Sequence, residues 1–370
     1  MKAILARLFS ELSRGLAIRV SIAHMQAIRF EHQGPPEVLH LCELPDPVPG
    51  PGQVLLEVHA ASVNHLDIWV RRELPGVQLP RIPGADAAGM VCAVGEGVSS
   101  PGPGTRVLLN PGYGCGSCAR CDEGETSLCR RYHILGESGD GTYCSKLVVA
   151  AEQCLPVPQD WSFEEAAAFP LVAITSWRMC VTRGALRAGE KVLILGASGG
   201  VGAMCVQLAR HRGCQVIATA STEEKLALCR RLGAEYTVNY SDSDWPRRVR
   251  ELAGRGGVDV TIDCVGKATW QQSLRLTRAG GRILTCGATT GHDPVEDLRH
   301  IFFRQLSVIG STMGSRQDLE AALAVAAQGE ISPVIHRVLP LSQAARAHQL
   351  IEDRAVLGKI VLVPDPLLEA

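Results

Sequence analysis

Short hydrophobic segments separated by turns dominate the first half of the chain. Between residues 25 and 64, brief apolar stretches alternate with clusters of proline and glycine, a pattern that is typical of β-strands joined by tight turns. The same texture continues at residues 89–98, 104–112, 142–150 and 154–158. We therefore expect this half to form a small β-barrel.

The pattern changes near Ser162, where helical stretches begin. Residues 161–181 have helical character, and Ser162 followed by Glu165 predicts an N-terminal capping box. Beyond this point short apolar strands alternate with helices. The strands are expected at residues 191–196, 214–220, 236–240, 258–266, 281–287 and 306–313. Alternation at this spacing predicts an α/β fold with a doubly wound parallel sheet.

The last part of the chain returns to a mixed pattern. After about Gly314 we expect a helix at 318–329, a strand at 334–340, a second helix and a closing strand at 359–364 that rejoins the first domain. The strand at 306–313 is apolar and is expected at a sheet edge, where a monomer would leave it unpaired. This favours a homodimer or homotetramer.

The charge balance bears on the class of partner. The chain has 370 residues, with 37 basic and 38 acidic side chains and a net charge of −1. It has no basic stripe interleaved with aromatic residues, so we expect no nucleic-acid partner. No apolar run approaches the ~18 residues of a membrane span. Scattered cysteines in apolar runs indicate a reducing, cytoplasmic compartment, and a small-molecule substrate is the expected partner.

Residues 1–24 differ from the rest of the chain. This segment contains four Lys or Arg residues and a single acidic residue, Glu11, and its apolar residues recur at helical spacing. Arg14 and Arg19 interrupt the apolar stretch, which argues against a secretory signal. Two interpretations remain, a dispensable extension before a folded protein that starts at Met25 and a segment for organellar import. We favour the first, because transit peptides carry a richer Ser and Arg bias.

Four closely spaced cysteines indicate a metal site. Two-residue gaps separate the first three, and a seven-residue gap precedes the fourth. The expected ligands are Cys115, Cys118, Cys121 and Cys129. This spacing is typical of a closed tetrahedral zinc site with four thiolates, and two disulfides or free thiols are the alternatives. A closed site leaves no open position for substrate, so one structural zinc per chain is expected.

A glycine-rich segment follows the first strand of the α/β half. It lies between that strand and a helix, at the start of a strand–helix–strand unit. Glycines permit a tight turn and let backbone N–H groups approach a pyrophosphate at the helix N-terminus. The residues expected to bind a dinucleotide are Gly196, Ser198, Gly199, Gly200, Val201 and Gly202. An ordinary glycine-rich turn is the alternative.

The end of the next strand bears on the choice of dinucleotide. An NAD site places an Asp or Glu about 20 residues further on, bonded to the ribose 2′-hydroxyl. Here the strand ends at Ala220 without a carboxylate, and Ser221 and Lys225 can hold a 2′-phosphate. Alternatively Ser221 and Glu224 form a capping box, and Glu223 serves a ribose. We favour NADPH over NADH.

These motifs resemble those of the medium-chain dehydrogenase/reductase superfamily, which includes zinc alcohol dehydrogenases and quinone reductases. The likeness runs from Met25 to about Pro364. It is carried by GPPEVL, PGPGQVLLEVHAASVN, IPGADAAGMVCAVGEGV, the four-cysteine lobe, GASGGVG and GKIVL. The resemblance implies a GroES-like β-barrel domain with a structural zinc lobe, a Rossmann domain, and a cleft between them.

The resemblance also implies a division of the chain. We predict an N-terminal extension at 1–24, a GroES-like catalytic domain at 25–171 with its zinc lobe at about 113–132, a Rossmann domain at 172–312, and a C-terminal segment at 313–370. The last segment is expected to return to the catalytic domain.

The chain departs from the zinc-dependent members at the catalytic metal. Those members carry a Cys, a His and a third ligand at the positions of Asn64, Ala85 and the residues around Val172. Asn and Ala supply neither thiolate nor imidazole, so we expect the catalytic metal to be missing. Without a Lewis acid a simple aldehyde is hard to polarise, whereas a conjugated acceptor needs only a few hydrogen-bond donors.

The likeness assigns further roles residue by residue. Asn64 is expected beside the nicotinamide and Thr175 at its carboxamide. Lys225 and Tyr240 match positions that bind the 2′-phosphate in NADPH-using relatives, and Lys359 matches a position near the phosphates.

The proton donor is less defined. His65 is the favoured titrating group because its ordinary pKa lies near neutrality, and Asp67 is a candidate to orient it. Alternatively His65 is a packing or surface residue, and Asp67 and Asp86 are structural carboxylates.

Together these observations predict an enzyme that transfers hydride from NADPH to an activated C=C bond or a quinone without catalytic zinc. One alternative is a zinc-dependent alcohol dehydrogenase with an atypical site that uses His65 and Asp86. Another is a protein that binds NADPH without turnover.

Overall fold

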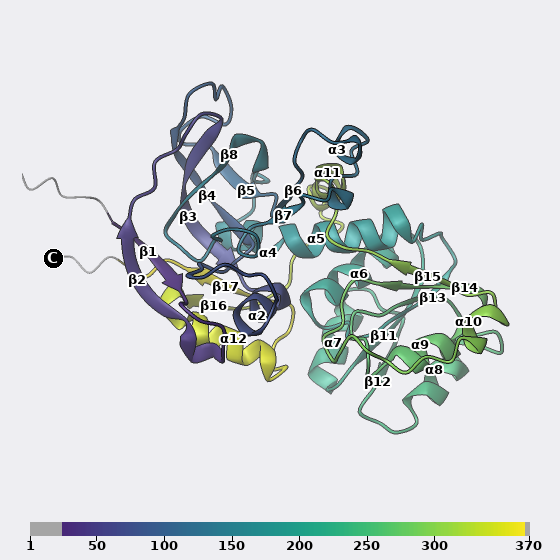
Figure 1. Ribbon diagram of the computed structural model, residues 1–370. Helices are drawn as coiled ribbons and strands as arrows, with labels where there is room; N and C mark the ends of the chain where they lie inside the picture. The colour runs from purple at the N-terminus through teal and green to yellow at the C-terminus, as the bar shows by residue number, and fades with distance from the viewer. Residues whose placement is uncertain (1–23, 367–370) are drawn as a thin grey trace, which may run out of the picture.

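The computed structural model describes residues 24–366 (Figure 1). In this range a hairpin and a seven-stranded sheet form the first domain. The sheet order is β16-β17-β3-β4-β5-β9, and β8 also pairs with β3. The strands are β1 (His24–Arg29), β2 (His40–Pro45), β3 (Gln53–Ser62), β4 (Asp86–Val94), β5 (Arg106–Leu109), β8 (Lys146–Ala150), β9 (Cys154–Pro156), β16 (Ile335–Pro340) and β17 (Lys359–Val363).

The closing strand returns to the first domain, as predicted. β17 runs antiparallel to β3, with Val361 opposite Ser62 and Leu362 opposite Ala61. The segment that follows the α/β half therefore completes the sheet of the first half. This return brings Lys359, at the start of β17, next to the end of β3.

A parallel sheet forms the second domain, again as predicted. Its order is β12-β11-β10-β13-β14-β15, and every pair is parallel. The strands are β10 (Lys191–Ile194), β11 (Gln215–Ala220), β12 (Tyr236–Asn239), β13 (Val258–Ile262), β14 (Thr277–Thr285) and β15 (Ser307–Gly310). From β10 the chain first adds β11 and β12 on one side, and it then returns to add β13, β14 and β15 on the other. The point between β10 and β13 is thus a topological switch point, where dinucleotides bind in this kind of sheet.

The central strand β10 is buried from Val192 to Ile194 because helices cover both faces of the sheet. Val192 and Ile194 of β10 pack in one core with residues of α6 and α7, whereas Leu193 packs with Val249 of α8 on the other face. The helices are α6 (Gly200–His211), α7 (Glu223–Arg231), α8 (Trp245–Ala253), α9 (Trp270–Leu276) and α10 (Arg299–Phe302). β15 lies at the sheet edge, as expected, and Val308 on it is exposed.

The helical stretch at residues 161–181 is divided rather than continuous. The predicted capping box is present, since Ser162 Oγ accepts from the Glu165 N–H at 3.2 Å and Glu165 Oε2 accepts from the Ser162 N–H at 2.9 Å. The first helix, α4, spans Phe163–Ala168, and α5 spans Pro170–Trp177, followed by a π-helical turn at Arg178–Arg183. The break falls at Phe169 because Pro170 has no N–H to continue the helix.

Within residues 24–366, four further α-helices lie outside the Rossmann sheet and the stretch at 161–181. They are α2 (His65–Arg72), α3 (Ala119–Asp122), α11 (Arg316–Ala326) and α12 (Ala344–Glu352). The short pair β6 (Gly112–Tyr113) and β7 (His133–Ile134) closes the base of the lobe. Among the helices described, none combines the length and apolar character needed to cross a bilayer. The predicted N-terminal extension lies outside the described residues, apart from His24.

Candidate active site

The glycine-rich turn links β10 to α6 at the switch point. Gly196 has φ +65°, a conformation that favours glycine. A Cβ on Gly202 would lie 2.4 Å from the Gly196 carbonyl oxygen, so the first turn of α6 also requires glycine. The turn leaves the N-terminus of α6, with Gly199 as its N-cap, at the carboxyl edge of the sheet, where a pyrophosphate is favoured.

The C-terminal strand is attached directly to this turn. The Gly358 N–H donates to the Ser198 carbonyl oxygen at 2.8 Å. A Cβ on Gly200 would lie 2.9 Å from Lys359 Cδ and 2.9 Å from Val172 Cγ1. The Lys359 stem therefore passes against the glycine turn before its ammonium group enters the first domain.

A buried polar cluster lies where this ammonium ends. Lys359 Nζ donates to Asn64 Oδ1 and lies 3.4 Å from Asp86 Oδ2. Asn64 Nδ2 donates to Asp86 Oδ2 at 2.9 Å, and the Leu171 N–H donates to Asp86 Oδ1 at 2.9 Å. Lys359, Asn64 and Asp86 are 3%, 5% and 0% exposed. Each polar group therefore depends on the others for hydrogen-bond partners in place of water.

Burial shifts the pKa values of both charged members of this cluster. Desolvation raises the pKa of Asp86, although Lys359 acts in the opposite direction. Desolvation likewise lowers the pKa of Lys359, and Asp86 opposes that shift. Contact with the phosphates of a dinucleotide remains a prediction for Lys359, whose ammonium group here is bound to Asn64 and Asp86.

Asp67 has different partners from those expected. Its Oδ2 accepts from the Asn64 N–H at 2.8 Å and from the Tyr143 hydroxyl at 3.0 Å, so it fixes the start of α2 rather than the His65 ring. Tyr143 also lies 3.3 Å from His348 Nε2. Sequence reasoning missed Tyr143 and His348, because no local motif marks a contact between residues so far apart. Desolvation raises the pKa of the buried Asp67 to about 7.

His65 is exposed at the N-terminus of α2. Protein nevertheless surrounds its ring on several sides, and this desolvation lowers its pKa, with further lowering by Lys359 and Arg354. At neutral pH the ring is therefore expected to be neutral, with one nitrogen available to donate a hydrogen bond.

The positions that hold a catalytic zinc in relatives are apolar or amide-bearing. Ala85 is fully buried, Val172 is 3% exposed, and Asn64 has both ends of its amide engaged by Lys359 and Asp86. Within residues 24–366, the cysteine lobe is the one group of three or more His, Cys, Asp or Glu with ligand atoms close enough to share a metal.

The four cysteines of the lobe gather as predicted. The Sγ atoms of Cys115, Cys118, Cys121 and Cys129 all lie within 4.8 Å of one another. The N–H groups of Cys115 and Arg131 donate to Cys129 Sγ at 3.5 and 3.3 Å. A Cβ on Gly114 would lie 2.6 Å from Cys121 Sγ, so the backbone leaves room for the sulfurs. This set of four thiolates fits a tetrahedral zinc ion.

Replacing Cys118 with serine is expected to remove the metal from this lobe. We expect about one zinc per chain in the unmodified protein and a near-zero content in Cys118→Ser, because a hydroxyl is a poor zinc ligand beside three thiolates. Metal analysis after exhaustive dialysis measures both values. Cys92→Ser, at an exposed cysteine, is the control and should keep its zinc. Full zinc content in Cys118→Ser would contradict the assignment.

Ser221, Lys225 and Tyr240 lie near the end of β11, and binding of a 2′-phosphate by them remains a prediction. Lys225 Nζ is 3.5 Å from Ser221 Oγ and donates to the Arg354 carbonyl at 2.6 Å, and the Tyr240 N–H donates to the Ala220 carbonyl at 3.0 Å. The suggested capping box of Ser221 and Glu224 is wrong. Thr222 is the N-cap of α7 instead, since its side chain accepts from the Lys225 N–H.

Thr175 lies apart from this cluster, in the second turn of α5. It is 6% exposed, and its hydroxyl is 3.9 Å from Met313 Sδ. Val201 of the glycine segment accepts a hydrogen bond from Ser176 at 3.2 Å. α5 is thereby packed against the start of α6, which places Thr175 near the glycine-rich turn.

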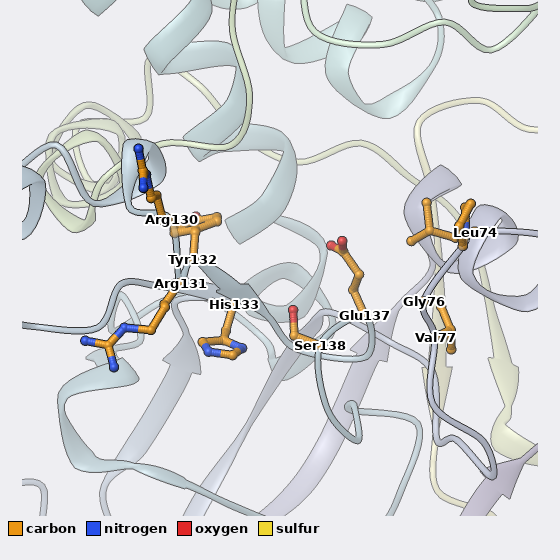
Figure 2. A pocket seen from close by; sticks show the side chains of 10 residues that line it. Leu74, Gly76, Val77, Arg130, Arg131, Tyr132, His133, Glu137 and Ser138 are labelled. Carbon is orange, nitrogen blue, oxygen red and sulfur yellow. The ribbon is translucent and has the colours of Figure 1, made fainter.

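A cavity of about 460 Å³ opens beside the zinc lobe. Figure 2 shows Glu137 between Leu74 and Val77 on one side and Tyr132 and His133 on the other. The Tyr132 hydroxyl donates to the Gly314 carbonyl at 3.2 Å, and Met313, the neighbouring residue, contacts Thr175. The cavity is therefore linked to the predicted nicotinamide contact through Gly314 and Met313. Sequence reasoning missed Glu137, the half-buried acid of this cavity. Desolvation raises the pKa of Glu137.

Comparison with known proteins identifies the family. Residues 50–159 match the alcohol dehydrogenase GroES-like domain, and residues 200–328 match the zinc-binding dehydrogenase domain. The chain belongs to the medium-chain dehydrogenase/reductase superfamily and is an oxidoreductase of that superfamily.

Two curated relatives span nearly the whole chain. Acryloyl-coenzyme A reductase of Metallosphaera sedula is 30% identical over 325 residues, which cover 86% of this chain and 95% of that protein. Quinone oxidoreductase of Sus scrofa is 32% identical over 350 residues, which cover 92% of this chain and 98% of that protein.

Two solved structures share the fold over a similar length. A structure described as an NAD-dependent alcohol dehydrogenase is 44% identical, with a TM-score of 0.89, and covers 92% of this chain and 100% of its own. A crotonyl-CoA carboxylase/reductase variant in complex with NADP is 27% identical, with a TM-score of 0.85, and covers 92% and 95%.

Proposed function

We propose that the protein reduces an activated C=C bond or a quinone with NADPH and without a catalytic metal. One observation carries the proposal. The position of a zinc-binding cysteine in relatives holds Asn64, whose amide is bound by the Lys359 ammonium and the Asp86 carboxylate. A cation that the protein supplies itself thus lies beside this position, and the donor set does not fit zinc.

The residues of the site suit addition to a conjugated acceptor. NADPH, when bound, supplies the hydride. The negative charge that develops on the acceptor spreads into an enolate, which a few hydrogen-bond donors stabilise. His65 is exposed at the start of α2, and we assign it the role of hydrogen-bond donor to this oxygen. Lys359 contributes positive potential from behind Asn64, and Asp67 holds the Asn64 backbone in place.

NADPH is favoured over NADH by the end of β11. Ser221 and Lys225 present a hydroxyl and an ammonium group there. Glu223, the carboxylate that a ribose would need, is exposed and paired with Arg230 instead. The NADP complex of a crotonyl-CoA carboxylase/reductase variant supports this choice, whereas the structure named as an NAD-dependent dehydrogenase favours NADH.

Replacing Lys225 with methionine is expected to raise the KM for NADPH about tenfold, which corresponds to about 1.4 kcal/mol. The physical reason is loss of the charge that faces the 2′-phosphate, while the apolar stem is retained. NADH lacks that phosphate and serves as the internal control, so its KM should stay unchanged. Steady-state kinetics with both dinucleotides measures the effect, and equal changes for the two would rule out the assignment.

The cavity next to the zinc lobe is the proposed substrate site. It combines the apolar side chains Leu74 and Val77 with His133 and the half-buried Glu137. Such a mixture suits a substrate with an apolar body and one polar conjugated group. The curated relatives named for acryloyl-coenzyme A and quinone reduction are consistent with this substrate class.

A substrate panel with metal analysis tests the proposal. Quinones, enones and enoyl thioesters are offered with NADPH and with NADH, beside aldehydes and alcohols. We expect turnover of a conjugated acceptor and one zinc per chain. The 44% identical structure named as an alcohol dehydrogenase supports a second candidate, which would show a second zinc and turnover of alcohols. NADPH binding without any turnover would support a non-catalytic role.

We also propose a homodimer joined through the β15 edge. Val308 is 43% exposed on this edge strand, and a second copy could pair with the outer edge of the strand. Light scattering at micromolar concentration measures the mass, and a monomer would argue against this assembly.

A further inference from the structure

We propose that Cys264 and Cys286 form a reversible dithiol–disulfide site at the carboxyl edge of the Rossmann sheet. Their Sγ atoms lie 3.2 Å apart. They follow β13 and β14 and stand two residues beyond the paired residues Ile262 and Leu284. Because side chains two residues apart on a strand share a face, the strand register itself brings the two thiols together. A disulfide requires an approach of only about 1 Å.

The backbone around Cys264 holds the thiols in place. The Asp263 carboxylate accepts from the Val265 and Gly266 N–H groups, both at 2.9 Å, and from the Ser273 hydroxyl at 2.6 Å. The Thr290 N–H donates to the Val265 carbonyl at 2.9 Å, which ties the segment after β13 to the segment after β14. Hydrogen bonds thus join the two segments that carry the cysteines.

The pair is placed to affect the dinucleotide site, a step that rests on the proposed function. A Cβ on Gly196 of the glycine turn would lie 3.2 Å from Val265 Cγ2, next to Cys264. A Cβ on Gly287, next to Cys286, would lie 3.9 Å from the Trp69 ring of α2. Drawing the two sulfurs together shifts segments that contact both the glycine turn and α2.

The oxidation balances with a small-molecule disulfide as the oxidant. One protein thiolate attacks a sulfur of the oxidant, which releases one small thiol and leaves a mixed disulfide. The second cysteine then displaces the second small thiol and closes the Cys264–Cys286 bond. Two electrons pass from the protein to the oxidant, and the two protons leave on the released thiols. Both cysteines are half-buried, so a small oxidant can reach them.

The environment of Cys264 disfavours its thiolate form. The hydrogen bond that Cys264 shares with Cys286, together with burial, raises the pKa of Cys264 well above its ordinary value. Because the thiolate is the attacking species, attack by Cys264 itself is expected to be slow at neutral pH.

Peptide mapping tests the site without any assumption about the reaction. The reduced full-length chain is incubated with oxidised glutathione, the remaining thiols are alkylated, and the digest is analysed by mass spectrometry. We expect a Cys264–Cys286 linked peptide that dithiothreitol removes, and in Cys286→Ser a glutathione adduct on Cys264. The exposed Cys92 is the internal control for the oxidant. Absence of the linked peptide once Cys92 is fully modified would overturn the proposal.

Dinucleotide titration tests the coupling. We expect oxidised protein to bind NADPH at least fivefold more weakly than reduced protein, with recovery after dithiothreitol. The double variant Cys264→Ser/Cys286→Ser, which can form neither the disulfide nor a glutathione adduct at this site, should lose this response, whereas Cys92→Ser should keep it. A linked peptide with unchanged affinity would overturn the coupling. Reduced protein that binds no dinucleotide would contradict the proposed function instead, while the peptide map would still decide the disulfide.

Discussion

Replacing Lys359 with methionine is expected to lower the free energy of unfolding by about 3 to 5 kcal/mol, the usual effect of removing one partner from a buried ion pair. The ammonium group is 3.4 Å from the fully buried Asp86 carboxylate and also binds the Asn64 amide oxygen. Methionine fills the space of the stem but leaves the Asn64 amide oxygen without this donor and the buried Asp86 carboxylate without its charged partner. Urea unfolding at pH 7 measures the loss.

Two further variants separate charge from packing. Lys146→Met breaks a pair with Asp46 that is partly exposed to solvent, so its loss should stay below about 1 kcal/mol. The double variant Lys359→Met/Asp86→Asn removes both buried charges and should recover much of the stability lost in Lys359→Met. If Lys359→Met lost no more stability than Lys146→Met, the buried pair would not have the importance that we assign to it.

Wild-type protein is expected to lose stability between pH 5 and pH 8 through Asp67, and Asp67→Asn is expected to remove that loss. Burial raises the pKa of Asp67 from its ordinary 3.8 to about 7. A raised carboxyl pKa means that the folded state retains a proton that the unfolded chain has released. Its contribution to stability is thus greatest at low pH and declines as pH rises toward about 7. The loss amounts to about 2 to 3 kcal/mol over this interval.

The comparison between the two proteins isolates Asp67 from other groups. Desolvation lowers the pKa of the buried His348 to about 3, which acts in the opposite direction, since protonation of the unfolded chain lowers stability as pH falls. His348 is present in both proteins, so the difference between their urea unfolding curves at pH 5, 6, 7 and 8 removes most of its contribution. Parallel pH profiles would show that Asp67 keeps an ordinary pKa in the fold.

Local sequence patterns predicted the order of most elements. The alternation of short apolar strands and helices predicted the parallel sheet, because a strand covered on both faces must be apolar along its length. Ser162 and Glu165 predicted a cap that is present. The helical character predicted for residues 161–181 is present, and Pro170 marks the point where the stretch divides into α4 and α5. The cap of α7 was placed one residue early, because Ser221 and Thr222 offer the same hydroxyl chemistry.

The two residue clusters that sequence spacing predicted are those with short chain separations. The cysteines of the lobe span residues 115–129, and the glycine segment spans residues 196–202. Their geometry depends on a few backbone turns, so residue types and gaps were sufficient to predict that they gather. Lys225 and Tyr240 were also brought together, since adjacent strands β11 and β12 place their ends side by side.

The contacts of the candidate active site depended on the tertiary structure. Lys359 and Asn64 are 295 residues apart in the chain, and Tyr143 and Asp67 are 76 apart. The meeting of such side chains depends on how β17 closes the first sheet and on what that closure buries, which no local periodicity records. By itself, therefore, the sequence determined the elements, the dinucleotide turn and the cysteine lobe. Which charges become buried neighbours was decided only by how β17 pairs with β3 and closes the first sheet, because burial creates the need for a partner and long-range strand pairing supplies it.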